Sequence, residues 1–211
     1  MTESFFTHEA AKAMTPQVEQ IVSSLLDNIA RKGCKDGPID LMSELAEPLN
    51  PKVILQCIYK VSEKDVNNLI TSNTSLGGTS GSASESGHTD LHEFMSKLVD
   101  DRMKKPGKPK DDLISKLAVE QCQKGKLDRD DMINLAFMVF VAGNTAITGS
   151  ISLGVLTLLM HPEQLDALKK DPGLAGKAVE ETLRFHTPSA LNSRRVATTD
   201  VTLGGKVAQR T

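Results

Sequence analysis

The chain has 211 residues, of which 39% are hydrophobic, and a formal net charge of -2. This length is enough for one domain with a hydrophobic core. The balanced charge leaves no basic footprint, so nucleic acid is not expected as a partner. Three widely spaced cysteines without a CxxC pair argue against a disulfide framework or a zinc site, and they are typical of a reducing compartment.

Helical signals dominate the first third of the chain. Thr15 followed by Pro16 predicts a helix start, and Gly33 predicts the end of that helix. A second helix is expected to be broken by Pro48. Ser62 is expected to cap the next one, because an acidic residue follows it three places later.

Residues 72–87 are rich in Ser, Gly and Thr and are expected to form a mobile surface loop. An apolar stripe then predicts a helix, which the Pro and Gly residues from Pro106 onward end. Asp111 or Asp112 is expected to start a short helix through Leu117. No metal site is expected, because the histidine pair at the edge of the loop has no third ligand nearby.

The longest element is predicted from about Asp130 to Met160, with Asp128 as a possible cap. Its stretch Ile133–Val141 is apolar almost all round, which indicates either a membrane span or the centre of a large core. Small and polar residues between Gly143 and Ser150 keep the apolar run shorter than the roughly 18 residues of a span. We therefore expect a buried central helix and no membrane span.

The carboxyl end changes character. A helix is expected after His161–Pro162, and another over Leu174–Phe185 before Pro188. Apolar residues around Gly204–Gly205 then predict short strands in a hairpin. The sequence thus predicts a mainly α fold with one long central helix and a small C-terminal β-hairpin.

A small polar break, Ala142-Gly143-Asn144-Thr145, interrupts the long apolar helix. A small residue there would let a large group lie against the helix backbone. The alternative is a bend that only eases packing, since Gly and Ser bends are common in helices.

Glu181 and Arg184 lie three residues apart on a predicted apolar helix and can pair on one face. If they are buried, they must be paired and hydrogen-bonded. The alternative is an ordinary exposed ion pair, which contributes little to stability.

The order of these features resembles the cytochrome P450 family. A long helix with Ala-Gly-Asn-Thr is followed by His-Pro-Glu-Gln-Leu, by Glu-Thr-Leu-Arg, and by Arg195 ahead of the glycine pair. Three segments narrow the resemblance to the fungal nitric oxide reductases, which take electrons directly from a reduced nicotinamide cofactor: Phe6–Ala10, Asp111–Leu117 and Thr187–Leu191.

The resemblance implies a partial P450 fold that binds haem b. Ala142, Gly143 and Asn144 are similar to the groove over the haem face, and Arg195 to a haem-propionate ligand. Glu181 and Arg184 resemble the ExxR pair of the family, which has a structural role.

The resemblance also implies a catalytic set of Asn144, Thr145 and Ser189, with Ser189 similar to a hydroxyl that delivers protons. Arg194 corresponds to a basic residue near the entrance for NADH or NADPH. One departure is plain: the family threonine two places after the asparagine is replaced here by Ala146.

Residues 1–211 are expected to form a single incomplete P450 domain. The early helices and the later loop with the axial cysteine have no counterpart in the chain. Cys34, Cys57 and Cys122 lie outside any Phe-Gly-rich loop and are expected to be structural or incidental.

The implied activity of the intact enzyme is reduction of nitric oxide to nitrous oxide with NADH or NADPH, as in fungal denitrification. Two alternatives stay open: a P450 monooxygenase acting on an organic substrate, and a truncated, non-catalytic remnant. A monomer is expected. Its expected location is the cytoplasm or mitochondrial matrix, because the amino end has no secretory signal.

Overall fold

The structure, a computed structural model, describes residues 2–35, 37–72, 85–187 and 196–208. It is mainly helical with a small antiparallel sheet, as the sequence predicts. The α-helices are α1 (His8–Lys32), α2 (Glu47–Val53), α3 (Glu63–Ser72), α4 (Glu85–Lys104), α5 (Leu113–Leu117), α6 (Arg129–Met160), α7 (Pro162–Lys170) and α8 (Ala175–Phe185). Wider π-helical turns lie at Met42–Ala46, Ile54–Ile58 and Ala118–Cys122, and the strands are β1 (Val201–Leu203) and β2 (Lys206–Ala208).

The long helix α6 confirms the predicted central element and is not broken at Gly143. A capping box starts it. The Asp128 carboxylate accepts from the Asp131 amide at 2.8 Å, and the Asp131 carboxylate accepts from the Asp128 amide at 3.1 Å. These two bonds satisfy amides that the first helical turn would otherwise leave without partners.

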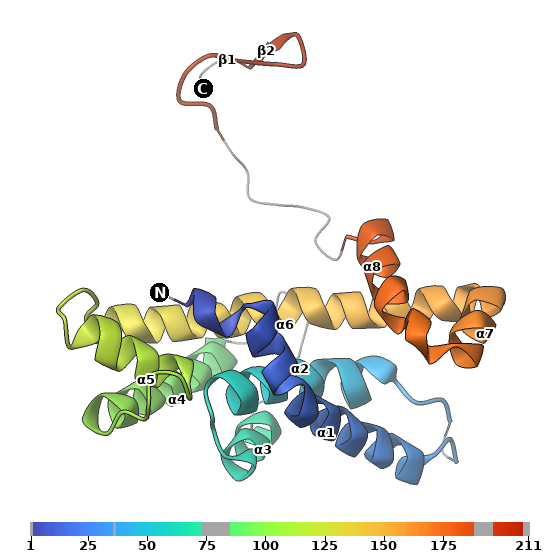
Figure 1. The fold of residues 1–211 in the computed structure, drawn as a ribbon, viewed down its shortest axis with the longest axis horizontal. Coiled ribbons are helices and arrows are strands. Elements are labelled where there is room, and N and C mark those ends of the chain that lie inside the picture. The colour runs from blue at the N-terminus through green and yellow to red at the C-terminus, as the bar shows by residue number, and fades with distance from the viewer. Residues whose placement is uncertain (1, 36, 73–84, 188–195, 209–211) are drawn as a thin grey trace.

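Burial of α6 is confined to one of its faces. Figure 1 shows α6 running the length of the molecule, with α1 to α5 on one side and α7 and α8 at its C-terminal end. Away from that face Met138 and Val141 are exposed, so the prediction of a buried central helix holds for one face of α6 only. The buried face consists of Met132, Ile133, Ala136, Phe140, Asn144 and Thr148.

Two polar side chains from the α2 region bind backbone carbonyls of α6. The Tyr59 hydroxyl donates to the carbonyl of Ala136 at 2.6 Å, and burial raises the pKa of this phenol. The Asn50 amide donates to the Thr148 hydroxyl at 2.8 Å and lies 3.3 Å from the Asn144 carbonyl. The Thr148 hydroxyl donates in turn to that carbonyl at 2.9 Å. Buried polar groups are tolerated only when bonded, and these bonds fix how α6 packs.

The start of the first helix differs from its prediction. Helix α1 begins at His8, where the hydroxyl of Thr7 accepts from the Ala10 amide at 3.2 Å. Pro16 therefore lies inside α1 and not at its start. Gly33 ends the helix with φ at +60°, as predicted, because glycine adopts this region without steric cost.

Pro48 also fails to break its helix. The π-helical turn before α2 ends with the Glu47 amide bonded to the Met42 carbonyl, and Pro48 then enters the first turn of α2. A proline costs less there than in a regular helix, because the wider π-helical turn before it already interrupts the i→i−4 bonding that proline would break. The chain therefore stays helical from Leu41 to Ile58.

The prediction of a loop over residues 72–87 is wrong at both ends of that range. Ser72 belongs to α3, and residues 85–87 belong to α4. The remainder of the predicted loop, residues 73–84, lies outside the described residues.

The predicted hairpin is confirmed. Strands β1 and β2 pair with Leu203 opposite Lys206, and Gly204 and Gly205 form the turn with φ of +56° and +76°. Positive φ at both central positions is the requirement of the common two-residue hairpin turn.

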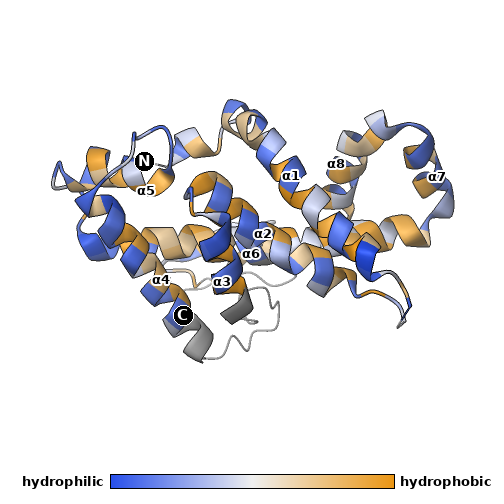
Figure 2. Cartoon of the chain, turned by 90° about the horizontal axis from the view of Figure 1, so that it is seen from below, coloured by the Kyte–Doolittle hydropathy of each residue, from blue (hydrophilic) through white to orange (hydrophobic). Residues whose placement is uncertain are grey.

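In helices other than α6, the distribution of polar and apolar side chains agrees with the packing. Figure 2 shows hydrophilic and hydrophobic residues sharing the surfaces of α1 and α4, as expected of helices with one buried face. Among the described helices, α6 is long and apolar enough to cross a membrane by length and composition. The core helices of other proteins share that property, and the bonds of Asn50 to Thr148 are those of a packed core.

Replacing Thr148 with valine tests the contact between Asn50 and α6. The Thr148→Val variant keeps the shape of the side chain but leaves the buried Asn50 amide without its hydroxyl partner. We expect the free energy of unfolding to fall by about 1–3 kcal/mol in chemical denaturation.

Ser150→Ala is the matched control, because the Ser150 hydroxyl makes the same bond four residues back on α6 but is only partly buried. Its cost should stay within about 0.5 kcal/mol. Equal losses in the two variants would contradict the role assigned to the Asn50 contact.

Candidate functional site

The polar break of α6 divides between an inner and an outer face. Asn144 is buried, and its carbonyl is the acceptor shared by Asn50 and Thr148. Ala142 is exposed on the other side. The side chain of Thr145 lies outside the described part of the chain. The inner half of the break thus serves packing, while the outer half is open.

Gly143 lets a neighbouring segment approach α6 closely. A β-carbon on Gly143 would lie 3.0 Å from the δ-carbon of Ile54, which is buried at the end of α2. On the inner side of α6, the group that lies against the helix at Gly143 is the side chain of Ile54. This contact supports the alternative interpretation of the polar break, in which its small residues only ease packing.

The outer face of α6 presents a small apolar surface. Met138, Val141 and Ala142 are exposed, and Val141 and Ala142 lie three and four residues after Met138, which places each of them beside Met138 on the helix surface. Such a surface can receive a flat apolar group.

Because α6 is continuous, the residue two places after Asn144 is fixed by helix geometry. Each residue turns the helix by about 100°. Ala146, which is exposed, lies two places after Asn144, where the resemblance to the P450 family implies a threonine. A hydroxyl is missing at that position.

Glu181 and Arg184 pair as predicted but are not buried. The Arg184 Nη2 and Nε donate to the two carboxylate oxygens of Glu181 at 2.6 and 2.7 Å. Their side chains are 62% and 69% exposed, so the predicted burial is wrong. Helix α8 contacts α6 through Thr182, whose methyl would meet a β-carbon on Gly154 at 3.2 Å, and the ion pair lies off that contact.

This pairing moves the acidity of the carboxylate. The hydrogen bond from Arg184 lowers the pKa of Glu181, and the positive charge of Arg184 lowers it further. A depressed folded-state pKa means that the pair is intact above the ordinary carboxyl pKa. The pair is lost as the pH falls through the depressed value.

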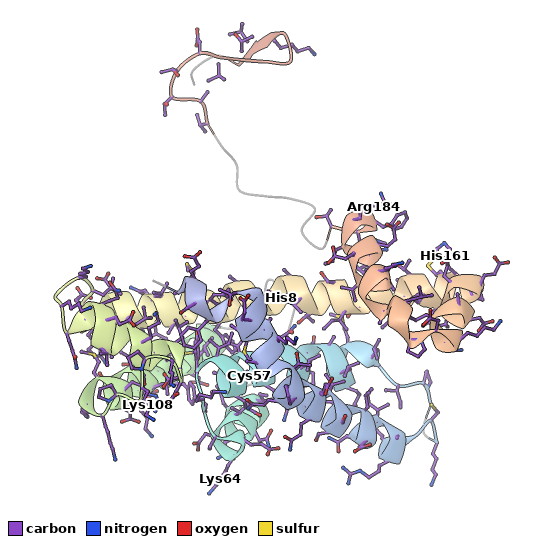
Figure 3. All side chains as sticks on the ribbon, viewed as in Figure 1. His8, Cys57, Lys64, Lys108, His161 and Arg184 are labelled. Atoms are coloured by element: carbon purple, nitrogen blue, oxygen red, sulfur yellow. The ribbon has the colours of Figure 1, made fainter. Side chains whose placement is uncertain are left out.

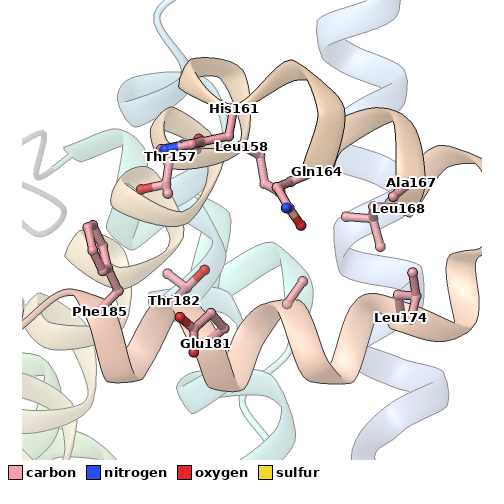
Figure 4. A pocket seen from close by; sticks show the side chains of 11 residues that line it. Thr157, Leu158, His161, Gln164, Ala167, Leu168, Leu174, Glu181, Thr182 and Phe185 are labelled. Atoms are coloured by element: carbon pink, nitrogen blue, oxygen red, sulfur yellow. The ribbon is translucent and has the colours of Figure 1, made fainter.

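A pocket of about 390 Å³ lies between the end of α6, α7 and α8 (Figure 4). Nδ1 of His161 donates to the carbonyl of Thr157 at 2.8 Å. The Thr157 hydroxyl donates to the Leu153 carbonyl at 2.7 Å and lies 2.6 Å from Nε2 of His186. Since the hydroxyl has one proton, this last contact requires the proton on Nε2 of His186. The pocket places Glu181 beside apolar side chains from all three helices.

The cysteines do not lie in surroundings that favour a thiolate. Cys57 is buried beside Ile21 and Leu25, and burial raises the pKa of its thiol more than Lys60 lowers it. Cys34 is exposed just after α1, and Cys122 is partly buried. A reactive or ligating thiol needs a lowered pKa, so the raised pKa of Cys57 argues against it as a ligand. Within the described part of the chain, no group of three potential metal ligands gathers.

Three predicted site residues, Ser189, Arg194 and Arg195, lie outside the described residues. Their roles stay predictions. Conversely, Asn50 and Thr148 are not among the predicted site residues, although both bind the Asn144 carbonyl from the core side. The available signal was a polar residue in each of two apolar segments, because a buried polar side chain needs a partner.

Comparison with known proteins decides what kind of fold this is. No family model matches the chain. Cytochrome P450 55A3 of Fusarium lichenicola is 37% identical over 209 residues, which are 98% of this chain and 50% of that protein. The solved structure of cytochrome P450 MoxA from Nonomuraea recticatena matches with a TM-score of 0.84 and 32% identity, over 98% of this chain and 50% of that one. The chain has part of the cytochrome P450 fold.

Other P450 proteins match over the same extent. Pentalenic acid synthase of Streptomyces avermitilis is 35% identical over 201 residues, 95% of this chain and 48% of that protein. The chain therefore spans about half the length of the curated P450 relatives it matches.

Haem is the group that the P450 family implies. The exposed apolar face of α6 fits it, because Ala142 is small and lies one helical turn from the exposed Met138. A propionate would need a cationic partner, the role predicted for Arg195.

A double-mutant cycle tests the contact of Gly143 with Ile54. Gly143→Ala should cost about 1 kcal/mol despite the better helix propensity of alanine, because the new methyl meets the Ile54 δ-carbon. In an Ile54→Val background that carbon is gone, and the same change should stabilise the protein. Additive effects in chemical denaturation would show that Gly143 is not needed for this approach.

Arg184→Gln tests the exposed ion pair. We expect the pKa of Glu181, followed by NMR titration, to rise toward the ordinary carboxyl value, while the denaturation midpoint barely changes. Arg31→Gln on α1 is the control and should leave the titration of Glu181 unchanged. A large loss of stability in Arg184→Gln would contradict the exposed position of the pair.

Proposed function

We propose that this chain forms the distal-helix half of a haem-thiolate oxidoreductase of the nitric oxide reductase type. The observation that carries the proposal is the open apolar face of α6 at Ala142, directly behind the buried Asn144. Haem bound there would supply the iron that holds nitric oxide and accepts electrons. The overall reaction turns two nitric oxide molecules, one NADH or NADPH and a proton into nitrous oxide, the oxidised cofactor and water.

The residues of the chain have separate roles in this proposal. Ala142 keeps the outer helix surface low, Gly143 lets Ile54 pack closely behind it, and the Asn50 contact holds that surface at a fixed distance from the core. Ser189 passes a proton toward the site. Arg194 binds a phosphate or carboxylate of the nicotinamide cofactor, which suits the forked geometry of a guanidinium.

The replacement of the family threonine by Ala146 affects how protons reach the proposed site. With Ala146 on the face where the family has its threonine, α6 offers no hydroxyl two places after Asn144. Delivery must then rest on Ser189 and water.

The nitric oxide reductase type is favoured by the segments Phe6–Ala10, Asp111–Leu117 and Thr187–Leu191, which resemble those enzymes. The 37% identity to the Fusarium P450 agrees with it. As part of the proposal, the protein works in the cytoplasm or mitochondrial matrix, where free cysteines such as Cys34 persist.

A P450 monooxygenase is the second candidate. Identity to pentalenic acid synthase is 35% and to 6-deoxyerythronolide B hydroxylase 32%, close to that of the Fusarium protein. The two candidates differ in electron supply: direct use of NADH or NADPH, against dependence on a separate redox partner.

The isolated 211-residue chain gives the first test. We expect haemin added to it to give no thiolate-type Soret band in the ferrous carbon monoxide difference spectrum, because the buried Cys57 thiol has a raised pKa. A thiolate band that disappears in Cys34→Ala, Cys57→Ala or Cys122→Ala would contradict this and identify the ligand.

A chimera tests the activity itself. The chain replaces the matching half of the Fusarium P450, and the parent protein is measured alongside. We expect a thiolate band and nitric oxide consumption with NADH or NADPH alone. Ser189→Ala should lower the rate by about 10²-fold, as for loss of a proton-transfer group. Arg194→Gln should raise the KM for the cofactor by roughly tenfold, the effect of losing about 1.4 kcal/mol of binding.

The monooxygenase would be favoured if the chimera does not turn over without a redox partner and hydroxylates an organic substrate once a redox partner is added. A chimera that folds but forms no thiolate band would show that these residues do not build a haem face.

A further inference from the structure

A second concave site lies away from the haem face, between the start of α1, the π-helical turn Ile54–Ile58 and the segment leading into α5. Its volume is about 590 Å³, within the usual range of small-molecule sites. Figure 3 labels Cys57 and Lys108, which line this cleft from two different segments. The cleft contains none of the residues assigned to haem, protons or the nicotinamide cofactor.

Four lysines line the cleft, and only part of their charge is neutralised. Lys116 pairs with Glu120 at 2.9 Å, and Lys60 donates to the Gln17 side chain at 3.2 Å. Lys108 and Lys110 have no carboxylate partner among the described residues. With Asp111 and Glu120 as the acidic lining residues, two positive charges remain in excess. Like charges gathered in a concave site attract an anion.

A partly buried network joins the segments that carry these lysines. The Arg102 guanidinium donates to the carbonyls of Tyr59 and Lys60 at 3.3 and 3.4 Å, and its Nε lies 3.4 Å from the Asp112 carboxylate. Asp112 caps α5, and the Ser115 hydroxyl accepts from the Gly107 amide at 2.8 Å. Both lysine-bearing segments are therefore tied to one point, which brings their exposed lysines to the same cleft.

Lys60 has a strained backbone. Its φ is +52°, a region that costs a non-glycine residue about 1–2 kcal/mol. Glycine would remove that cost at this turn. A lysine kept under strain at the edge of a cationic cleft is a pattern found at functional sites.

The floor of the cleft is apolar. Phe5 is buried, and Ala10, Ala13 and Met14 complete the floor from α1. A cationic rim beside an apolar floor fits a ligand with two parts, a polyanion and a flat ring. Lysine ammonium groups bind phosphates as point charges, and the floor can take an aromatic base.

We propose that this cleft binds a nucleoside diphosphate or triphosphate, with its phosphates on Lys108 and Lys110 and its base over Phe5. The site is independent of the proposed haem chemistry. It does not require the nicotinamide cofactor, whose predicted contact is Arg194.

Calorimetric titration of the 211-residue chain with ADP, pyrophosphate and adenosine tests the site. We expect ADP to bind at one site, pyrophosphate more weakly, and adenosine not measurably at the same concentrations. Binding of ADP should weaken when salt is raised, since the phosphate contacts are solvent-exposed charges.

The variant Lys108→Gln/Lys110→Gln should weaken ADP binding at least about tenfold, the effect of losing about 1.4 kcal/mol. Both positions are exposed, so the fold should persist, which circular dichroism checks. The control variant Lys64→Gln/Lys177→Gln removes the same charge from exposed positions on α3 and α8. It should change the ADP affinity by no more than about twofold, well below the tenfold change that about 1.4 kcal/mol gives.

Three results would overturn the proposal. Equal weakening by both double variants would mean that net charge, not the cleft, attracts ADP. Adenosine or pyrophosphate binding as tightly as ADP would remove the case for a nucleotide. No binding of ADP or pyrophosphate to the folded chain would mean that the cleft is no anion site. None of these results bears on the chimera, so the two proposals fail separately.

Discussion

The contact between Asn50 and the middle of α6 fixes the rest of the arrangement. A 32-residue helix with apolar residues on every side can pack in many rotations at similar cost. The buried Asn50 amide has partners only where the Thr148 hydroxyl and the Asn144 carbonyl face it. That requirement sets which side of α6 faces the core. It thereby places Gly143 against Ile54 and leaves Ala142 outside.

Features controlled by a few neighbouring residues could be predicted from the sequence. The caps at Asp112 and Asp128, the stop at Gly33 and the Gly204–Gly205 turn each depend on local backbone bonds, and the structure has all of them. The start of α1 could not be predicted in the same way. A helix begins at the earliest cap that its packing supports, so Thr7 precedes the Thr15 signal.

The faces of the site residues could not be read from the sequence, because an apolar helix has no periodicity that separates inside from outside. Ala142 and Asn144 differ in burial only through their neighbours. The same limit applies to Glu181 and Arg184. Their spacing predicts the pairing, which is local, but burial depends on what packs against α8, and that contact passes through Thr182. The family resemblance identified the residues, and packing decided their exposure.

One device positions both proposed sites: a buried or half-buried polar side chain that binds backbone carbonyls of another segment. Asn50 does so for the haem face of α6, and Arg102 does so for the lysine cleft at Tyr59 and Lys60. The two networks meet at the segment from α2 to Tyr59, whose hydroxyl binds the Ala136 carbonyl on α6 while its own carbonyl accepts from Arg102. Because each carbonyl bond is short-ranged, loss of one network should weaken its own surface first. The core around Tyr59 is the place where damage to one could reach the other.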